Sequence, residues 1–282
     1  MTEKILIVGM GFLGKTIYTN SQKLGITVEG TYHNRDPQLD ICDSKSIENV
    51  ILSLKPSIIY NCVALTNLDE IEKNPQRAYD VNAYGAKNLA EMALKHKIKL
   101  VQLSTDGVFD GTKGMYSEDD LPNPINEYSK SKKLGEEFVS NTLKNYIIVR
   151  TNFYGLHENG KFLFNWIIKN LKTNHEIVGF DDVIFNPLEV NNLSQMLLQL
   201  KNTNFKGILH LSSDQVMSKY QFAKKIASIL DYDSNLIRRG SIQDLKFIAK
   251  RPLNTSLSNH KARKILKTKP ISLEKWLREE FI

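Results

Sequence analysis

Tyr128 and Lys132 stand four residues apart at the start of a predicted helix over Tyr128–Thr142. Four residues are about one helical turn, so both side chains lie on one face. A free tyrosine hydroxyl titrates near pH ~10, and a neighbouring ammonium favours the phenolate. We therefore expect Lys132 to lower the pKa of Tyr128 and make it a proton donor for a substrate oxygen. The spacing alone is common in lysine-rich chains, so its meaning depends on the surrounding segments.

Three polar residues, Ser104, Thr105 and Asp106, come at the end of a predicted strand over Lys99–Leu103. In open α/β sheets, ligands bind outside the carboxyl ends of the strands. We therefore expect Thr105 next to the reacting group, with the Tyr128 helix packed alongside. Ser104 and Asp106 are further candidates for substrate contacts.

A glycine-rich turn follows the first predicted strand, Ile5–Val8, and opens the first predicted helix, Leu13–Leu24. Gly9 permits a tight turn, Gly11 lets the backbone approach a pyrophosphate, and Gly14 allows close packing of helix and strand. At a first strand–helix junction, this spacing predicts a dinucleotide site. The residues of the turn expected to contact the dinucleotide are Gly9, Gly11, Phe12, Leu13 and Gly14.

The end of the second predicted strand, Thr27–Tyr32, indicates which dinucleotide binds. An acidic residue there would accept the ribose 2′-hydroxyl of NAD. This chain has Asn34 and Arg35 instead. A guanidinium attracts a 2′-phosphate, so the sequence favours NADP over NAD.

Strands and helices alternate through the first half of the chain, which predicts a doubly wound parallel Rossmann sheet. We expect a dinucleotide-binding domain over 1–150 and a smaller α/β substrate domain over 151–282, with segments that can return to the first domain. Trp166 and Trp276 lie among apolar helical positions and are expected in the core. The remaining predicted strands are Ile58–Asn61, Tyr146–Arg150 and Ile208–Leu211, and the remaining predicted helices are Ser46–Leu54, 76–96, Phe162–Leu171, Asn191–Leu200 and Lys219–Leu230.

The composition is that of an ordinary globular protein of 282 residues, with 41% hydrophobic and 24% charged residues. No apolar run has the length of a membrane span, and the four apolar residues before Gly9 are too few for a secretory signal, so we expect a cytoplasmic protein. Neither the two cysteines nor the six histidines have the spacing of metal ligands, and we expect no protein-held metal.

The net charge of +7 is concentrated in the second half of the chain. Residues 151–282 carry 20 basic and 12 acidic side chains, a net charge of +8, whereas residues 1–150 carry 18 and 19. The excess is either a generic basic surface or an attraction for an anionic ligand. Without a recognised nucleic-acid motif, we expect no binding to nucleic acid.

With these features the sequence resembles the extended short-chain dehydrogenase/reductases that act on nucleotide sugars, and within them the dTDP-4-dehydrorhamnose reductase group. The similarity runs through most of the chain. The matching stretches are Asn61–Thr66, Val81–Leu89, Ser104–Gly111, Tyr116–Glu118, Pro122–Pro124, Asn126–Lys132, Gly135-Glu136, Val149–Thr151 and Arg251–Asn254.

The resemblance implies NADPH-dependent reduction of a 4-keto group on a nucleotide-linked deoxysugar, and a homodimer as one option. It implies that Thr105 binds the reacting oxygen, that Tyr128 donates the proton and that Lys132 binds the nicotinamide ribose. By the same resemblance, Asn82 positions Lys132 or a relay water. It also implies that Val63 and Ala64 line the cofactor cleft. Arg150 is a candidate for a substrate contact or only fixes the end of its strand. Arg251 is a candidate for the pyrophosphate, because a planar guanidinium can bind two phosphate oxygens at once.

The chain differs from the family pattern at three places. Its glycine turn is one residue shorter than Gly-x-x-Gly-x-x-Gly, Gly107 replaces a tyrosine, and the stretch beginning at Phe185 replaces a glycine-proline-threonine sequence. Two alternatives stay open. One is a nucleotide-sugar epimerase, and the other is a non-catalytic NADP-binding subunit like the methionine adenosyltransferase β subunit.

Overall fold

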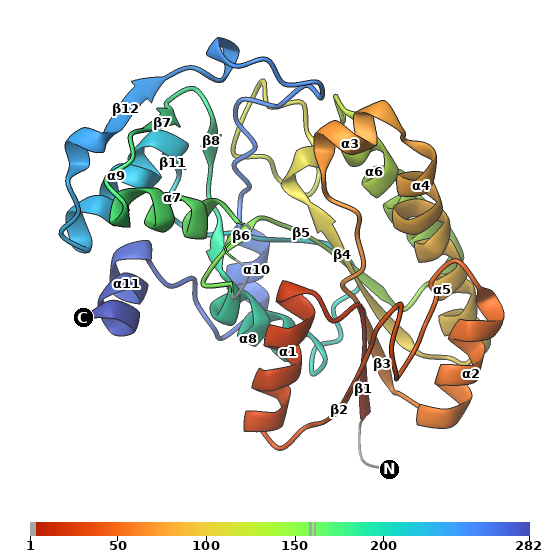
Figure 1. Cartoon of the computed structure of the whole chain (residues 1–282). Helices are drawn as coiled ribbons and strands as arrows, with labels where there is room; N and C mark the ends of the chain where they lie inside the picture. The colour runs from red at the N-terminus through yellow and green to blue at the C-terminus, as the bar shows by residue number, and fades with distance from the viewer. Residues whose placement is uncertain (1–3, 158–159, 161) are drawn as a thin grey trace.

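The computed structural model describes residues 4–157, 160 and 162–282, and its largest element is a six-stranded parallel sheet (Figure 1). The strand order is β10-β5-β4-β3-β1-β2. The chain leaves β1 for β2 on one side and then crosses to β3 on the other, so the strand order reverses between β1 and β3. Such a switch point is where doubly wound sheets bind their ligands. The strands are β1 (Lys4–Val8), β2 (Thr27–Thr31), β3 (Ile58–Asn61), β4 (Lys99–Thr105), β5 (Tyr146–Thr151) and β10 (Gly207–Leu211).

Helices cover both faces of this sheet, as the apolar sequence of its strands requires. Ile5 and Ile7 of β1 face one hydrophobic core, while Leu6 and Val8 face the other. The helices that contribute to the first core are α1 (Phe12–Lys23), α8 (Val190–Leu200) and α10 (His260–Ile265), and those of the second are α2 (Ser44–Leu54), α5 (Gly85–Lys95) and α6 (Glu127–Thr142). The predicted doubly wound parallel sheet is confirmed.

The helix predicted over 76–96 is interrupted in the structure. It begins as α4 (Gln76–Ala78), continues as a π-helical segment over Tyr79–Tyr84 and ends as α5. Short π-helical segments often occur at functional sites. Here the segment contains Asn82. The short helix before it, α3 (Leu68–Lys73), is not predicted from the sequence.

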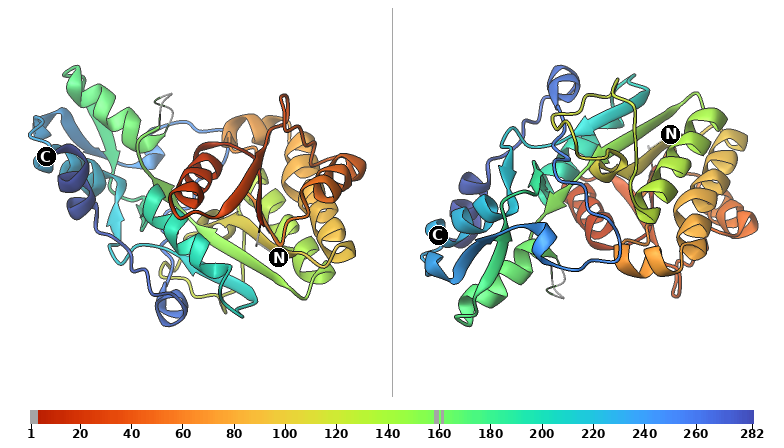
Figure 2. Two further views of the ribbon diagram at one scale, coloured as in Figure 1. Left: turned by 90° about the horizontal axis from the view of Figure 1, so that it is seen from below. Right: turned by 90° about the horizontal axis from the view of Figure 1, so that it is seen from above.

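A second group of elements lies beside the sheet and has its own hydrophobic core (Figures 1 and 2). Its centre is formed by the aromatic side chains of Phe164, Phe222 and Trp276. The sequence predicts its first two helices but none of its short strands. The elements are α7 (Leu163–Lys172), α9 (Lys219–Ile229) and α11 (Leu273–Phe281), with β7 (Ile177–Phe180) paired to β12 (Ile237–Gly240), β8 (Ile184–Phe185) to β11 (Met217–Ser218), and β6 (Phe153–Tyr154) to β9 (Leu188–Glu189). Short 3-10 helices lie at Asp106–Val108, Ser234–Leu236 and Ile242–Asp244.

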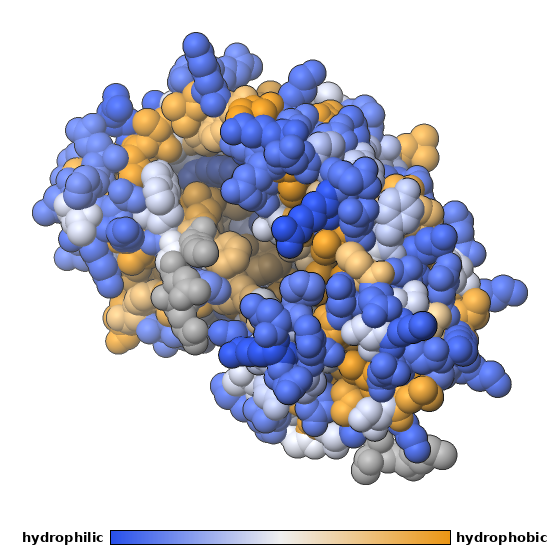
Figure 3. Space-filling view, turned by 45° about the vertical axis from the view of Figure 1, so that its right-hand side comes forward, coloured by the Kyte–Doolittle hydropathy of each residue, from blue (hydrophilic) through white to orange (hydrophobic). Residues whose placement is uncertain are grey.

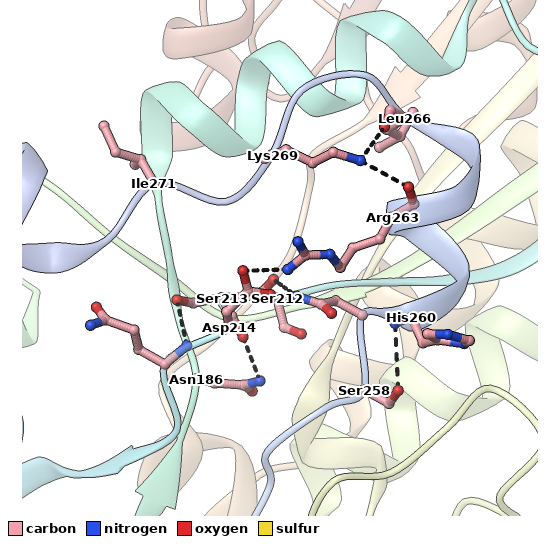
Figure 4. Close-up of polar contacts among 12 residues, drawn as sticks. Asn186, Ser212, Ser213, Asp214, Ser258, His260, Arg263, Leu266, Lys269 and Ile271 are labelled. Carbon is pink, nitrogen blue, oxygen red and sulfur yellow. Dashed lines mark hydrogen bonds and ion pairs between the residues drawn. The ribbon is translucent and has the colours of Figure 1, made fainter.

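Segments from the second half of the chain also pack against the sheet. β10 pairs with β5, and α8 packs against α1. A cluster of polar contacts connects α10 to the segment that follows β10 (Figure 4). In it, Arg263 pairs with Asp214 at 2.5 Å, and Asn186 donates to the carbonyl oxygen of Ser213 at 2.9 Å. The division into domains 1–150 and 151–282 stays a prediction.

Within the described ranges, no helix combines the length and apolarity that crossing a membrane would require. Across the same residues, no group of three or more His, Cys, Asp or Glu side chains has the arrangement of a metal site.

Candidate active site

Tyr128 is positioned by the capping of helix α6. The Asn126 side chain accepts a hydrogen bond from the backbone N–H of Ser129 at 2.9 Å, which fixes the start of the helix. The same side chain donates to the carbonyl oxygen of Lys250 at 2.9 Å, so the loop before Arg251 is fastened to the helix end. Tyr128 therefore lies where the first turn of α6, the end of β4 and the 250 loop meet.

The pKa of Tyr128 is raised, opposite to the shift expected from the sequence. Burial of the phenol, together with the nearby carboxylate of Asp106, raises its pKa to about 12. A hydrogen bond with the Thr105 hydroxyl acts in the other direction and lowers the pKa. Tyr128 is therefore a neutral phenol at physiological pH, the form from which a proton can be donated.

Lys132 is buried one turn further along α6 and is held by the sheet. Its ammonium donates a 2.7 Å hydrogen bond to the carbonyl oxygen of Leu103 in β4. Burial lowers the pKa of Lys132 to about 8, while the nearby Glu136 and Cys62 act to raise it. Lys132 is not among the groups that shift the pKa of Tyr128. The two predicted partners thus share a helix face, but the expected electrostatic effect on the tyrosine is absent.

Asp106 is a buried carboxylate beside this pair. Its oxygens accept hydrogen bonds from Thr255 at 2.6 Å, Asn152 at 3.0 Å and Thr105 at 3.2 Å. Burial raises the pKa of Asp106, and these three hydrogen bonds partly oppose the rise. The carboxylate therefore fixes the rotamer of the Thr105 hydroxyl that faces Tyr128.

Thr105, Asp106 and Tyr128 line a cavity of about 400 Å³, called the reaction cavity below. Figure 3 shows the molecular surface hollowed between the sheet and the second group of elements, with apolar side chains on the floor of the hollow. Arg251 also lines the reaction cavity, and it pairs with Asp69 at 2.9 Å. Gly107 lies on the wall, where an added Cβ would come 2.9 Å from the Ser129 hydroxyl. The structure thus brings together Thr105, Asp106, Tyr128 and Arg251.

The glycine turn has the close contacts expected of a dinucleotide site. Gly9 has a φ of +95°, and a Cβ there would lie 2.7 Å from the Val63 side chain. A Cβ at Gly14 would lie 2.1 Å from the carbonyl oxygen of Gly9. At Gly11 an added Cβ would meet nothing within 4 Å, and this N-terminus of α1 has no side-chain cap. Open space before uncapped N–H groups suits a phosphate, so these residues fit a dinucleotide pyrophosphate.

A cleft of about 560 Å³ extends from this turn along the ends of β1, β2 and β3, and is called the dinucleotide cleft below. Five of the predicted cofactor residues line it: Gly9, Gly11, Asn34, Val63 and Ala64. Arg35 is exposed at the end of β2, and its guanidinium carbon lies 3.9 Å from the centre of the Tyr32 ring. Tyr32 lines the cleft, so Arg35 lies at its rim.

Two predicted cofactor residues lie elsewhere. The side chain of Leu13 points into the core between α1 and α8, so its prediction as a cofactor contact is wrong for the side chain. Phe12 packs against Phe162 and His157, with ring centroids 5.1 and 4.8 Å away, on a different groove. Position between glycines does not fix the direction of a side chain, because successive residues of a helix point to different faces.

Asn82 connects the dinucleotide cleft to α6. Its amide donates to the Leu65 carbonyl oxygen at 3.1 Å and to the Ser131 hydroxyl at 3.0 Å, and its oxygen accepts from the Leu65 N–H at 2.9 Å. It therefore holds the loop after β3 against the residue preceding Lys132. Gly135 permits this approach, since a Cβ there would lie 2.5 Å from the Asn82 carbonyl oxygen.

Ser104 and Arg150 were predicted as candidates for substrate contacts, but neither lines the reaction cavity. The Arg150 guanidinium is buried and pairs with Glu136 at 2.7 Å, while the Ser104 hydroxyl donates to Glu136 at 2.5 Å. Ser104 and Arg150 are neighbours in the β4–β5 register, so they share one face of the sheet. Thr105 points to the opposite face. Ser104 and Arg150 thus form a buried polar network away from the reaction cavity.

The residues that the sequence analysis missed in the reaction cavity include three with polar side chains: Asn152, Lys219 and Thr255. Thr255 directly follows the Arg251–Asn254 stretch, so its position was a usable signal. Lys219 begins a predicted helix and has no distinguishing neighbour in the sequence. Trp166 was expected in the core but is 44% exposed, whereas Trp276 is buried as predicted.

Comparison with known proteins agrees with this geometry. The family model described as "RmlD substrate binding domain" matches residues 3–281. A dTDP-4-dehydrorhamnose reductase of Bacillus anthracis, crystallised in complex with NADP, superposes with a TM-score of 0.91 at 32% identity, covering 100% of this chain and 99% of that one. A dTDP-4-dehydrorhamnose reductase of Aggregatibacter actinomycetemcomitans is 31% identical over 255 residues, 86% of each chain.

A relative with a different name is nearly as similar. Methionine adenosyltransferase 2 subunit beta of Bos taurus is 29% identical over 280 residues, which are 90% of this chain and 80% of the relative. Overall sequence identity therefore does not distinguish a reductase from a subunit of another enzyme. The distinction depends on the side chains of the candidate site.

Proposed function

The chain belongs to the RmlD substrate binding domain family, and on this premise we propose that it reduces the 4-keto group of a nucleotide-linked deoxysugar with NADPH. The observation that carries the proposal is the convergence of Thr105, Tyr128 and Lys132 at the end of β4. The similarity to dTDP-4-dehydrorhamnose reductases, one of them crystallised with NADP, supports the same reaction.

The turn at Gly9 and Gly11 would hold NADPH in the dinucleotide cleft, and the cofactor would supply the hydride for the carbonyl carbon. The Thr105 hydroxyl, held by Asp106, orients the carbonyl oxygen toward Tyr128. As the carbon–oxygen double bond becomes single, Tyr128 transfers its phenolic proton to that oxygen, and the product is an alcohol. The phenolate then takes a proton from water.

In the proposed reaction, Lys132 contributes its charge and its fixed position. Its ammonium is held by the Leu103 carbonyl oxygen and is therefore fixed in position. On this proposal the fixed ammonium binds the nicotinamide ribose and does not act on the pKa of Tyr128. The raised pKa of Tyr128 suits an acid in this direction of reaction, because the proton is present before the substrate carbonyl arrives.

A second candidate function, suggested by the methionine adenosyltransferase relative, is a non-catalytic NADP-binding subunit. One experiment separates the two. The purified chain is mixed with NADPH and a panel of 4-keto-6-deoxy sugars linked to dTDP, UDP or GDP, and NADPH oxidation is followed together with formation of the reduced sugar. Stoichiometric oxidation with one member supports the reductase. NADPH binding without oxidation across the panel contradicts it and favours the subunit.

An epimerase would use the same tyrosine and lysine but return the hydride to the substrate. It would therefore interconvert sugars without net consumption of NADPH. A panel of nucleotide sugars that carry a 4-hydroxyl, incubated with NADP⁺, detects this outcome as a new sugar product with no net formation of NADPH, which would contradict the reductase.

A further inference from the structure

The 250 loop, residues 245–251, connects the second group of elements to the helices beside the sheet. In Figure 1 the chain leaves β12, runs over the top of the molecule to α3 and then turns back. The loop contributes Phe247 and Arg251 to the wall of the reaction cavity. Residues 245–248 are exposed, whereas Ala249 is buried. The contacts at the end of the loop therefore decide where this part of the cavity wall lies.

Three consecutive residues of the 250 loop are each held by the first half of the chain. One carboxylate oxygen of Asp69, in α3, accepts a hydrogen bond from the Ala249 N–H at 3.0 Å and another from the Arg251 guanidinium at 2.9 Å. Between them, the carbonyl oxygen of Lys250 accepts from the Asn126 side chain that caps α6. Asp69 therefore holds the loop at two points, on either side of its contact with α6.

The same short helix also holds the start of α6. Glu72 follows Asp69 by three residues, so the two carboxylates share one face of α3. The Glu72 carboxylate accepts a hydrogen bond at 3.0 Å from the N–H of Glu127, the first residue of α6 and the neighbour of Tyr128. One helix thus holds the loop that carries Arg251 and the helix that carries Tyr128, and it fixes one side of the reaction cavity relative to the other.

The ion pair between Asp69 and Arg251 fixes a position more than it stabilises the fold. The two side chains are 34% and 22% exposed, and an ion pair with that exposure contributes little to the free energy of unfolding. The Arg251 guanidinium carbon lies 5.0 Å from the centre of the Phe247 ring, which in turn meets Phe180 edge to face with centroids 6.2 Å apart. Holding Arg251 therefore also holds the aromatic part of the cavity wall.

We propose that Asp69 is a positioning residue for the proposed reaction, because it holds the 250 loop against α3 and so keeps the wall of the reaction cavity in place before the substrate arrives. The inference rests on the proposed function and extends it to a residue of α3. A loop that is ordered in advance loses no further freedom when a ligand binds, so its order favours affinity. Without Asp69, substrate binding should weaken while the chemistry at Tyr128 continues.

The test compares wild type and Asp69→Ala in two measurements on the full chain. Hydrogen exchange of the Ala249 amide, followed in peptides that cover 245–251, should become at least about tenfold faster, because this N–H loses its acceptor. The KM for the sugar that the panel identifies should rise about tenfold or more, with kcat within about threefold of wild type. Asp69→Asn keeps an acceptor oxygen and should restore most of both properties. Glu70→Ala, at the next and exposed position of α3, is the matched control, and NADPH titration reports whether the dinucleotide cleft is intact.

The outcomes separate this inference from the proposed function. If wild type reduces a sugar and Asp69→Ala keeps the wild-type KM or the wild-type exchange at Ala249, the inference is overturned while the reductase proposal stands. Equal losses in Asp69→Ala and Glu70→Ala would also overturn it, because they show a general effect on α3. If wild type oxidises no NADPH with any sugar of the panel, the proposed function fails and the inference with it. If Asp69→Ala does not fold, Asp69→Leu fills the same space without an acceptor and decides by the same two measurements.

Discussion

The ammonium of Lys132 donates a 2.7 Å hydrogen bond to the carbonyl oxygen of Leu103 and is thereby anchored to strand β4. Two residues beyond Leu103, the same strand ends in Thr105, which contacts Tyr128. One strand end therefore positions both the cation and the hydroxyl that the proposed reaction needs. The polar contacts around this strand end are the basis of the following predictions.

Asn82 is expected to be a positioning residue rather than a catalytic one. Asn82→Ala removes three hydrogen bonds and leaves the half-buried backbone N–H and carbonyl of Leu65 without their partner, while the Ser131 hydroxyl keeps its bond to the Tyr128 carbonyl oxygen. We expect the free energy of unfolding to fall by about 1–3 kcal/mol and NADPH binding to weaken. Chemical denaturation and an NADPH titration measure the two effects, with the exposed Asn145→Ala as control. Unchanged stability together with unchanged NADPH affinity would refute the positioning role.

Arg35 is expected to select NADPH over NADH. Arg35→Glu places a carboxylate at the rim of the dinucleotide cleft, where it repels a 2′-phosphate but not a 2′-hydroxyl. The dissociation constant for NADPH should rise about tenfold or more, and that for NADH should change little. Fluorescence titration with both dinucleotides measures the ratio, and Arg238→Glu, on exposed β12, controls for a general change of charge. An unchanged dissociation constant for NADPH would remove Arg35 from the site.

Arg150 is expected to stabilise the fold and not to bind substrate. Arg150→Leu leaves the buried carboxylate of Glu136 without its partner, and we expect a loss of about 3–5 kcal/mol in the free energy of unfolding. The double variant Glu136→Met with Arg150→Leu should recover part of that loss, because neither member of the buried ion pair is left without its partner. Denaturant unfolding measures all three proteins, and the exposed Arg278→Leu serves as control. A stable Arg150→Leu protein with selectively weakened dTDP binding would restore the substrate role.

His210 is expected to make the fold sensitive to acid. Burial, with Arg150 nearby, lowers the pKa of His210 from 6.5 to about 3, and its Nδ1 donates to the Tyr116 carbonyl oxygen because that oxygen can only accept. Between these two pH values the unfolded chain binds one more proton than the folded chain. Stability should therefore fall as pH drops from 6.5 toward 3, by at most about 1.4 kcal/mol per pH unit from this group.

The measurement for His210 is denaturant unfolding at several pH values from 7 downward. His210→Gln, which can still donate to the Tyr116 carbonyl oxygen, should show a flatter dependence on pH. If both proteins lose stability with the same slope, other groups cause the acid sensitivity.

Local spacing predicted the parts of the site that local geometry creates. A turn of four residues places Tyr128 and Lys132 on one helix face, and steric contact at Gly9 and Gly14 requires glycine whatever the rest of the chain does. The parallel sheet follows from alternating strands and helices. These features depend on neighbours in the sequence.

The positions that could not be predicted depend on contacts between residues that are distant in the sequence. Ser104 and Arg150 were assigned to the substrate because their stretches match the family, but a match does not tell on which face of a strand a side chain lies. Lys219 and Arg251 line one cavity only because the loop before Arg251 is held against the start of α6, and no local sequence pattern indicates this contact. The pKa of Tyr128 likewise depends on burial by segments that no local pattern specifies.

The central claim is that Tyr128 gives its proton to the substrate, and Tyr128→Phe tests it most directly. The variant and wild type are compared by NADPH oxidation with the sugar that the panel identifies, together with an NADPH titration, and Tyr146→Phe in β5 serves as control. We predict that kcat falls about 100- to 10,000-fold while the NADPH dissociation constant stays the same. Wild-type turnover by Tyr128→Phe would contradict the account.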